Sequence, residues 1–170
     1  MVPCLCLYDL IIMSTFYFHK IIRDFDRKAI FVHCRNNLVS VNEVRPLRIL
    51  LAEDQIINQK LCQKILNGMG HEVDIASDGE EAIQLWNNGD YDLILMDVQM
   101  PGTDGIRAVQ VIRESELRQG AARTPIIALT AYGMKNFRES LISQGFDSYI
   151  SKPIDIDILK DELCRVSRKE

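Results

Sequence analysis

Five polar residues stand at or just after the ends of short apolar runs, where a β-strand would stop. They are Glu53, Asp54, Asp97, Thr130 and Lys152. Three carboxylates, a hydroxyl and an ammonium brought to one place would suit phosphoryl chemistry around a divalent cation. The question for the rest of the sequence is whether its elements can bring them together.

The expected chemistry follows from the charges. Uncompensated carboxylates repel one another and raise their pKa values, and a hard cation such as Mg²⁺ relieves this through oxygen ligands. With the metal bound, Asp97 can stay ionised and attack phosphorus, because carboxylates form acyl-phosphate intermediates. Lys152, the Thr130 hydroxyl and the backbone N–H groups after Asp97 would then neutralise the transferred group.

Beyond Pro46, apolar runs alternate with helical patterns five times. The predicted strands are "LRILLA" (47–52), "HEVDIA" (71–76), "YDLILMD" (91–97), "TPIIALTA" (124–131) and "DSYISKP" (147–153). The predicted helices are a stretch carrying Ile57, Leu61 and Ile65 that stops at Gly68 and Gly70, followed by 79–89, 105–120, 134–145 and 155–166. Each later helix also has an apolar face: Ala82, Ile83 and Trp86; Ile106, Val109 and Ile112; Met134, Phe137 and Leu141; Ile156, Leu159, Leu163 and Val166.

This alternation predicts an α/β fold. The runs at 47, 91 and 124 are nearly continuous, which is typical of strands covered on both faces, and helical crossovers make neighbouring strands parallel. The result is a doubly wound, five-stranded parallel sheet, in which ligands bind beyond the carboxyl ends of the strands near the switch in strand order. The five polar residues would meet at that edge. The loop "MPGTDG" after Asp97 is a turn signal, in which Pro101 fixes one dihedral and Gly102 and Gly105 supply flexibility.

Residues 1–45 are a separate N-terminal extension with no assignable function, and 46–170 form the functional domain. Ile11, Phe18, Ile22 and Phe25 could share a helix face, and "AIFVHC" and "LVSV" could form a hairpin. The opening run "MVPCLCLYDLIIMSTFYF" is interrupted by Asp9 and is too short to span a membrane.

The composition suits a cytoplasmic protein. Five cysteines form neither a CxxC pair nor a zinc-type cluster with histidine, which favours reduced, inert thiols. Lys and Arg number fourteen against twenty Asp and Glu in residues 46–170, so the second part is acidic and direct binding to nucleic acid is not expected.

The segments "LLAED", "LMDVQMPGTDG", "ALTA" and "SKP" resemble, in order and spacing, the receiver domain of two-component response regulators, over about residues 47–166. "LLAEDQIINQKL" further looks like the receivers of hybrid sensor kinases. The resemblance implies a flavodoxin-like sheet and a phosphoryl group accepted by Asp97. The implied roles of the remaining residues are Mg²⁺ binding by Glu53, Asp54, Asp97 and the Gln99 main-chain carbonyl, phosphate contact by Thr130 and Lys152, switching by Thr130 and Tyr149, and a cis peptide between Lys152 and Pro153.

By the same resemblance, the phosphoryl group comes from a histidine kinase or a histidine phosphotransfer domain, and the signal passes to a downstream protein. The chain would not be an enzyme beyond its own phosphorylation and slow autodephosphorylation. We expect Gln99 and Tyr132 to set the lifetime of the phosphate. Homodimerisation on phosphorylation is a further possibility. With no output domain after Glu170, the chain looks like a stand-alone receiver or the tail of a hybrid kinase.

Three alternatives use the same architecture. A pseudo-receiver would keep the fold and act only as an interaction surface. A haloacid dehalogenase-type phosphohydrolase needs a second acid two residues after the nucleophile, where this chain has Gln99. A flavodoxin-like FMN binder needs a hydroxyl-rich phosphate loop after the first strand, and "AEDQII" has the wrong charge for it.

Overall fold

The computed structural model describes residues 31–34, 37–40, 45–131 and 135–167. Its main sheet has five parallel strands in the order β4-β3-β5-β6-β7. In chain order these strands are β3 (Arg48–Ala52), β4 (Glu72–Ala76), β5 (Leu93–Asp97), β6 (Ile126–Thr130) and β7 (Ser148–Ser151). The doubly wound, five-stranded parallel sheet expected from the sequence is confirmed.

Burial follows the position of each strand in the sheet. Four of the five residues of β3 and all residues of β5 and β6 are buried, which confirms the interpretation of their continuous apolar runs. The edge strands β4 and β7 are mostly half-buried. Because β3 pairs with β4 on one side and with β5 on the other, the strand order reverses there, and the carboxyl ends of β3 and β5 flank the switch point.

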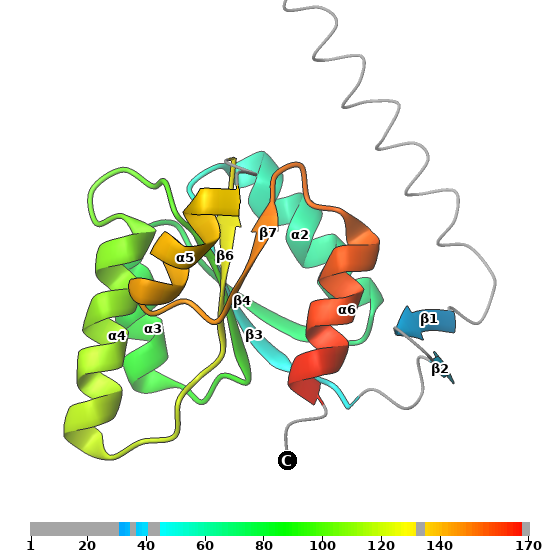
Figure 1. Cartoon of the computed structure of the whole chain (residues 1–170), viewed down its shortest axis with the longest axis horizontal. Helices are drawn as coiled ribbons and strands as arrows, with labels where there is room; N and C mark the ends of the chain where they lie inside the picture. The colour runs from blue at the N-terminus through cyan, green and yellow to red at the C-terminus, as the bar shows by residue number, and fades with distance from the viewer. Residues whose placement is uncertain (1–30, 35–36, 41–44, 132–134, 168–170) are drawn as a thin grey trace, which may run out of the picture. The chain divides into compact units, whose positions relative to one another are not determined.

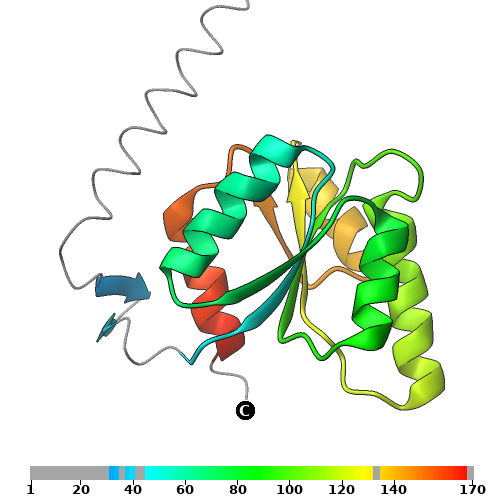
Figure 2. The ribbon, with the colours of Figure 1, turned by 180° about the vertical axis from the view of Figure 1, so that it is seen from behind.

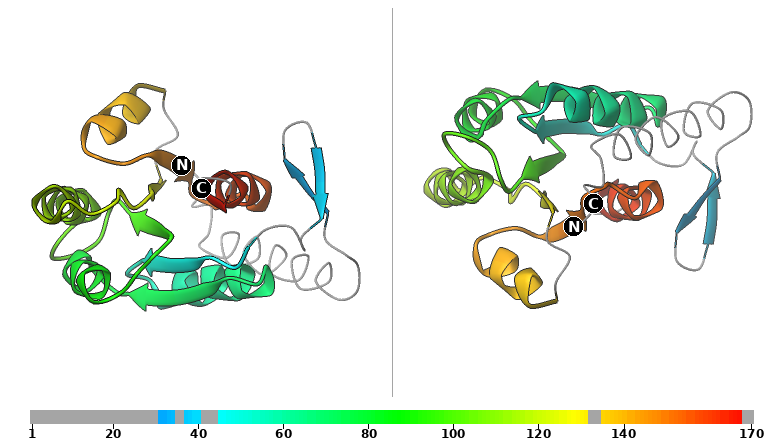
Figure 3. Two further views of the ribbon diagram at one scale, coloured as in Figure 1. Left: turned by 90° about the horizontal axis from the view of Figure 1, so that it is seen from below. Right: turned by 90° about the horizontal axis from the view of Figure 1, so that it is seen from above.

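The helices form a layer on each face of the sheet. They are α2 (Ile56–Gly68), α3 (Gly79–Asn88), α4 (Gly105–Gln119), α5 (Lys135–Ser143) and α6 (Ile156–Ser167). Figures 1 and 2 show α2 and α6 on one side of the sheet and α3, α4 and α5 on the other, and Figure 3 shows the same layers end-on. Alternate strand residues enter two cores, with Leu50 and Ile94 in the α3–α4 core and Ile49 and Leu95 in the α2–α6 core.

The predicted inward faces hold for α3, α4 and α6. Ala82, Trp86, Val109, Ile112, Leu159, Leu163 and Val166 are buried, while Ile83, Ile106 and Ile156 pack against the cores half-buried. On α5, Leu141 is buried as expected. Met134 and the side chain of Phe137 lie outside what the structure describes.

The predicted face of α2 is wrong at its start. Ile56 and Ile57 are 64% and 81% exposed, Leu61 is half-buried, and the buried face carries Gln59, Cys62, Ile65 and Leu66. A step of four residues advances about 40° past a full helical turn, so a series spaced by four drifts off the face that Ile65 occupies. Burial raises the pKa of the Cys62 thiol to about 11, in agreement with the inert thiol predicted.

The hairpin prediction is also confirmed. β1 (Phe31–Cys34) and β2 (Asn37–Ser40) pair antiparallel. The helix face proposed for residues 11–25 lies outside the described residues, and the domain division at residue 46 stays a prediction. No helix in the described part of the chain combines the length and apolarity needed to cross a bilayer.

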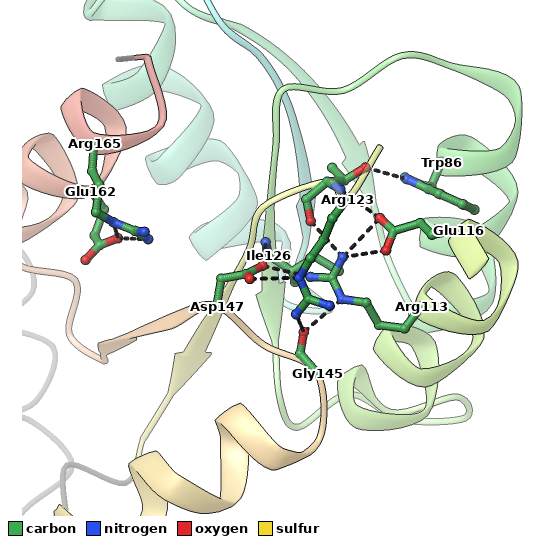
Figure 4. A network of polar contacts seen from close by, with 10 residues as sticks. Trp86, Arg113, Glu116, Arg123, Ile126, Gly145, Asp147, Glu162 and Arg165 are labelled. Carbon is green, nitrogen blue, oxygen red and sulfur yellow. Dashed lines mark hydrogen bonds and ion pairs between the residues drawn. The ribbon is translucent and has the colours of Figure 1, made fainter. Parts of the chain in front are cut away.

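A half-buried arginine, which sequence reasoning missed, joins α4 to the rest of the domain (Figure 4). The Arg113 guanidinium donates to both carboxylate oxygens of Glu116, to the carbonyls of Thr124 and Gly145, and to Asp147 Oδ2 at 2.7 Å. Asp147 Oδ2 in turn accepts from a backbone N–H at the start of β6. The network therefore fixes α4 to the start of β6 and to the turn between α5 and β7.

Candidate functional site

The strand ends bring the predicted acids together. Glu53 and Asp54 directly follow β3, and Asp97 is the last residue of β5, the strand paired with β3. One carboxylate oxygen from each of the three residues lies within 4.8 Å of the others. Glu53 and Asp97 are buried and Asp54 is half-buried, so the cluster opens to solvent mainly on the side of Asp54.

Lys152 reaches this cluster from the end of β7, the edge strand two places from β5. Its Nζ lies 2.6 Å from Glu53 Oε2 and 2.5 Å from Asp97 Oδ2, so one ammonium bridges two carboxylates. Thr130 ends β6, the strand between β5 and β7, and is 2% exposed. The Lys152 backbone N–H donates to the Thr130 carbonyl at 2.7 Å, which ties the end of β7 to the end of β6. All five predicted strand-end residues therefore lie along one sheet edge.

The electrostatics favour a further cation. Burial raises the pKa of the Asp97 carboxyl above its ordinary value, and this outweighs the hydrogen bonds from Lys152 and from the Gln99 N–H. Burial alone would lower the pKa of the Lys152 ammonium, but its hydrogen bonds to Asp97 and Glu53 raise it. Among the described residues, the cluster thus has three acids, and Lys152 pairs with two of them. The all-oxygen donor set fits a hard divalent ion such as Mg²⁺ better than a soft transition metal.

The loop after Asp97 is fixed by alternate side chains. Val98 and Met100 are buried, whereas Gln99 between them is exposed. The Gln99 backbone N–H donates to Asp97 Oδ1 at 3.0 Å, so the loop also orients the carboxylate. Asp97 therefore has one carboxylate oxygen held by a backbone N–H and the other by the Lys152 ammonium.

Glycine is required at position 105 for lack of space rather than for the backbone flexibility expected from the sequence. It begins α4 with its backbone against the end of β5, and a Cβ at this position would lie 2.0 Å from the Asp97 carbonyl oxygen. Gly102 does have the left-handed backbone conformation that favours glycine, with φ of +75°. Close approach at Gly105 and turn geometry at Gly102 together place the loop.

Sequence reasoning also missed the residues that hold Glu53. Asn58 Nδ2 donates to Glu53 Oε1 at 2.9 Å, and Gln59 Nε2 donates to the Glu53 carbonyl at 2.6 Å. Both amides lie in the first turns of α2. The available signal was a polar pair one turn after the acids, with Gln59 on a helix face whose other buried residues are Cys62, Ile65 and Leu66.

The remaining predicted residues are placed as follows. Tyr149 on β7 is half-buried, packs against the α3–α4 core and pairs with Ala128 of β6. The Lys152–Pro153 peptide bond is cis. Tyr132 lies outside the described residues.

Comparison with known proteins agrees with this geometry. Residues 49–163 match the family described as the response regulator receiver domain. The chain belongs to this family. It is therefore a receiver domain of the phosphorelay systems of two-component signal transduction.

Hybrid signal transduction histidine kinase I of Dictyostelium discoideum is 36% identical over 136 residues, which cover 75% of this chain and 8% of that kinase. The receiver thus spans a small part of this relative's length. Two solved receiver domains share the fold of this chain, and each covers 72% of it.

The first solved receiver is that of Saccharomyces cerevisiae Ssk1, determined with the histidine phosphotransfer signaling protein Ypd1; it has 29% identity, a TM-score of 0.69 and 89% of its length matched. The second is the receiver of sensor histidine kinase PA1611 from Pseudomonas aeruginosa PAO1, with 35% identity, a TM-score of 0.64 and 98% of its length matched. The PA1611 structure has a magnesium ion coordinated in its active site cleft.

Proposed function

We propose that this receiver accepts a phosphoryl group on Asp97 from a phosphohistidine of a histidine kinase or a histidine phosphotransfer domain. The observation that carries the proposal is the cluster at the sheet edge. Carboxylate oxygens of Glu53, Asp54 and Asp97 lie within 4.8 Å of one another, and Lys152 bridges two of them. Such a cluster can hold both a divalent ion and a transferred phosphate.

In the transfer, the phosphorus–nitrogen bond of the donor breaks as a bond forms between phosphorus and an Asp97 carboxylate oxygen. The departing imidazole nitrogen takes a proton from solvent. Lys152 pairs with the phosphoryl oxygens, and the Thr130 hydroxyl donates to one of them. Mg²⁺, held by Glu53, Asp54, Asp97 and the Gln99 carbonyl, would supply further neutralisation of the phosphoryl charge.

The phosphate would bias a two-state equilibrium. As the Thr130 hydroxyl is drawn to the phosphoryl group, the half-buried Tyr149 ring moves inward on the neighbouring strand. Gln99 is exposed directly beside Asp97 and, with Tyr132, would limit access of water to the acyl phosphate and set its lifetime. The chain then returns to its resting state by slow autodephosphorylation and turns over no other substrate.

A protein donor suits the rim of the site. Ile56 and Ile57 are strongly exposed on α2, two and three residues beyond Asp54, so apolar surface lies beside the acids. A small donor would leave that surface in water, whereas a docked protein would cover it. We place the functional unit at residues 46–170, in the cytoplasm, with a downstream target protein, without direct binding to nucleic acid, and with homodimerisation on phosphorylation left open.

The test is incubation with acetyl phosphate and Mg²⁺ followed by intact-mass measurement. We expect the wild type to gain one phosphate and Asp97→Asn to gain none, and chelation of the metal by EDTA to abolish the gain. Asp90→Asn removes an exposed carboxylate elsewhere on the surface and serves as the matched control. An equal gain on Asp97→Asn would refute the assignment. No gain on folded wild type would favour a pseudo-receiver, and steady hydrolysis of a phosphomonoester would favour a phosphohydrolase.

A further inference from the structure

We propose that Asn58 is a positioning residue that holds the Glu53 carboxylate in the divalent-cation site, an inference that rests on the proposed function. Asn58 Nδ2 donates to Glu53 Oε1 at 2.9 Å from the first turn of α2. The other carboxylate oxygen, Oε2, accepts from Lys152. Each oxygen of Glu53 therefore has its own side-chain donor.

The two donors, Lys152 and Asn58, would behave differently during phosphoryl transfer. Lys152 also binds Asp97 and would pair with an incoming phosphoryl group, so its bond to Glu53 must change during the reaction. Asn58 binds no other residue of the acidic cluster, and its second, longer contact is to Gln55 Oε1 at 3.4 Å. Its bond to Glu53 can persist while Lys152 moves. The amide thus fixes the orientation of the carboxylate whichever state the site is in.

A glutamate needs such an anchor more than an aspartate would. Its side chain has one more methylene and one more rotatable bond, and fixing it costs more rotamer entropy. The backbone of Glu53 is already held on both sides, because its N–H donates to the Ala76 carbonyl at 3.0 Å and its own carbonyl accepts from Gln59. The Asn58 amide completes this by holding the far end of the side chain.

The chemistry of the donor also fits a metal site. A neutral amide orients the carboxylate without cancelling its charge, whereas a second lysine or arginine would compete with the divalent ion. Helix formation does not explain the residue, since asparagine has a lower helix propensity than alanine and the N-cap of α2 is Gln55. Partners that orient a metal ligand typically change metal affinity by ~10–100-fold when they are removed.

The experiment measures Mg²⁺ and Mn²⁺ dissociation constants by titration calorimetry without any phosphodonor. We expect Asn58→Ala to weaken binding by about tenfold. Asn58→Leu keeps the number and branching of the side-chain heavy atoms; it should give the same result and thereby guards against a packing effect. The matched control is Asn88→Ala, which also removes a hydrogen bond donated by an asparagine amide, here within α3 from Nδ2 to the Gln84 carbonyl at 2.8 Å and far from the acids. The metal affinity of this variant should equal that of wild type. Thermal unfolding without metal shows that each variant is folded.

A double-mutant cycle then separates this role from a general structural one. In a Glu53→Asp background the shorter side chain no longer reaches the amide, so Asn58→Ala should change affinity by less than about twofold. An equal loss in both backgrounds would mean that Asn58 acts through another group, and the inference would be wrong. Wild-type affinity retained by both Asn58 variants would also overturn it. Failure of the wild type itself to bind either metal would instead refute the proposed function.

Discussion

Alanine at Gly105 places intrinsic helix propensity and tertiary packing in opposition. Gly105 is the first residue of α4, and no positive φ requires glycine there. Helix propensity alone therefore predicts that Gly105→Ala raises the free energy of unfolding by roughly 0.5–1 kcal/mol. The structure predicts the opposite sign.

The magnitude follows from the distance to the end of β5. A Cβ at Gly105 would lie 2.0 Å from the Asp97 carbonyl oxygen and 3.0 Å from Met96 Cγ, against an ordinary contact of 3.4 Å or more. The backbones must therefore separate by more than an ångström, and overpacking of this kind costs about 3 kcal/mol. After the propensity gain, we expect a net loss of about 2 kcal/mol, or about 8 °C in the thermal midpoint of a domain of this size. Displacement of the Asp97 backbone should also weaken Mg²⁺ binding.

Urea unfolding at fixed pH measures the sign directly, with Gly120→Ala as the control. Gly120 ends α4 with φ of +62°, and a Cβ there would meet nothing within 4 Å, so its replacement should lose only about 1 kcal/mol from backbone strain. Greater stability of Gly105→Ala than of wild type, or undisturbed metal binding in the variant, would refute the packing argument.

Three further predictions concern other parts of the domain. Arg113→Met should lower the free energy of unfolding by about 3 kcal/mol, because it leaves the buried Glu116 carboxylate without its ion-pair partner and leaves Asp147 paired with the exposed Arg123 alone. Arg165→Met, which breaks an exposed pair on α6 (Figure 4), should change the free energy of unfolding by less than about 1 kcal/mol in urea unfolding. Burial lowers the pKa of His71, whose Nδ1 accepts from the Leu47 N–H, so the unfolded chain binds a proton on this imidazole more readily than the folded chain does. The free energy of unfolding should therefore fall as pH drops below about 6.5, and His71→Gln should lose this part of the pH dependence between pH 7.5 and 5.5. Identical pH dependence in wild type and variant would contradict this assignment. Gln99→Asn should alter the decay rate of the aspartyl phosphate without preventing its formation, and an unchanged decay followed by intact mass would count against that role.

Part of the site is predictable because strand ends are encoded locally. The continuous apolar runs of β3, β5 and β6 identify central strands, and the polar residue that ends each run must lie at the same edge of a parallel sheet. Glu53, Asp97 and Thr130 are therefore predictable from the sequence as neighbours at one edge. The cause is topological: right-handed crossovers leave a βα repeat little freedom in where its strands end.

Other features depend on which surfaces meet, and a linear pattern does not contain that information. Ile57 fits an apolar series spaced by four residues, yet the buried face of α2 is set by the sheet against which the helix packs, and Ile57 lies outside it. His71 has no ligand-like spacing in the sequence, but in the fold its imidazole accepts a backbone hydrogen bond across 24 residues. Arg113 collects partners from three separate segments.

The sequence by itself determined the class of sheet, the order of its elements and the set of residues at its carboxyl edge, because these follow from periodicity and from polar residues at the ends of apolar runs. Only the tertiary structure decided how the carboxylates are oriented, through Asn58 on Glu53 and the Gln99 N–H on Asp97, and why Gly105 must lack a side chain. Hydrogen-bond direction and interatomic clearance are properties of surfaces in contact, and they exist only after the chain has folded.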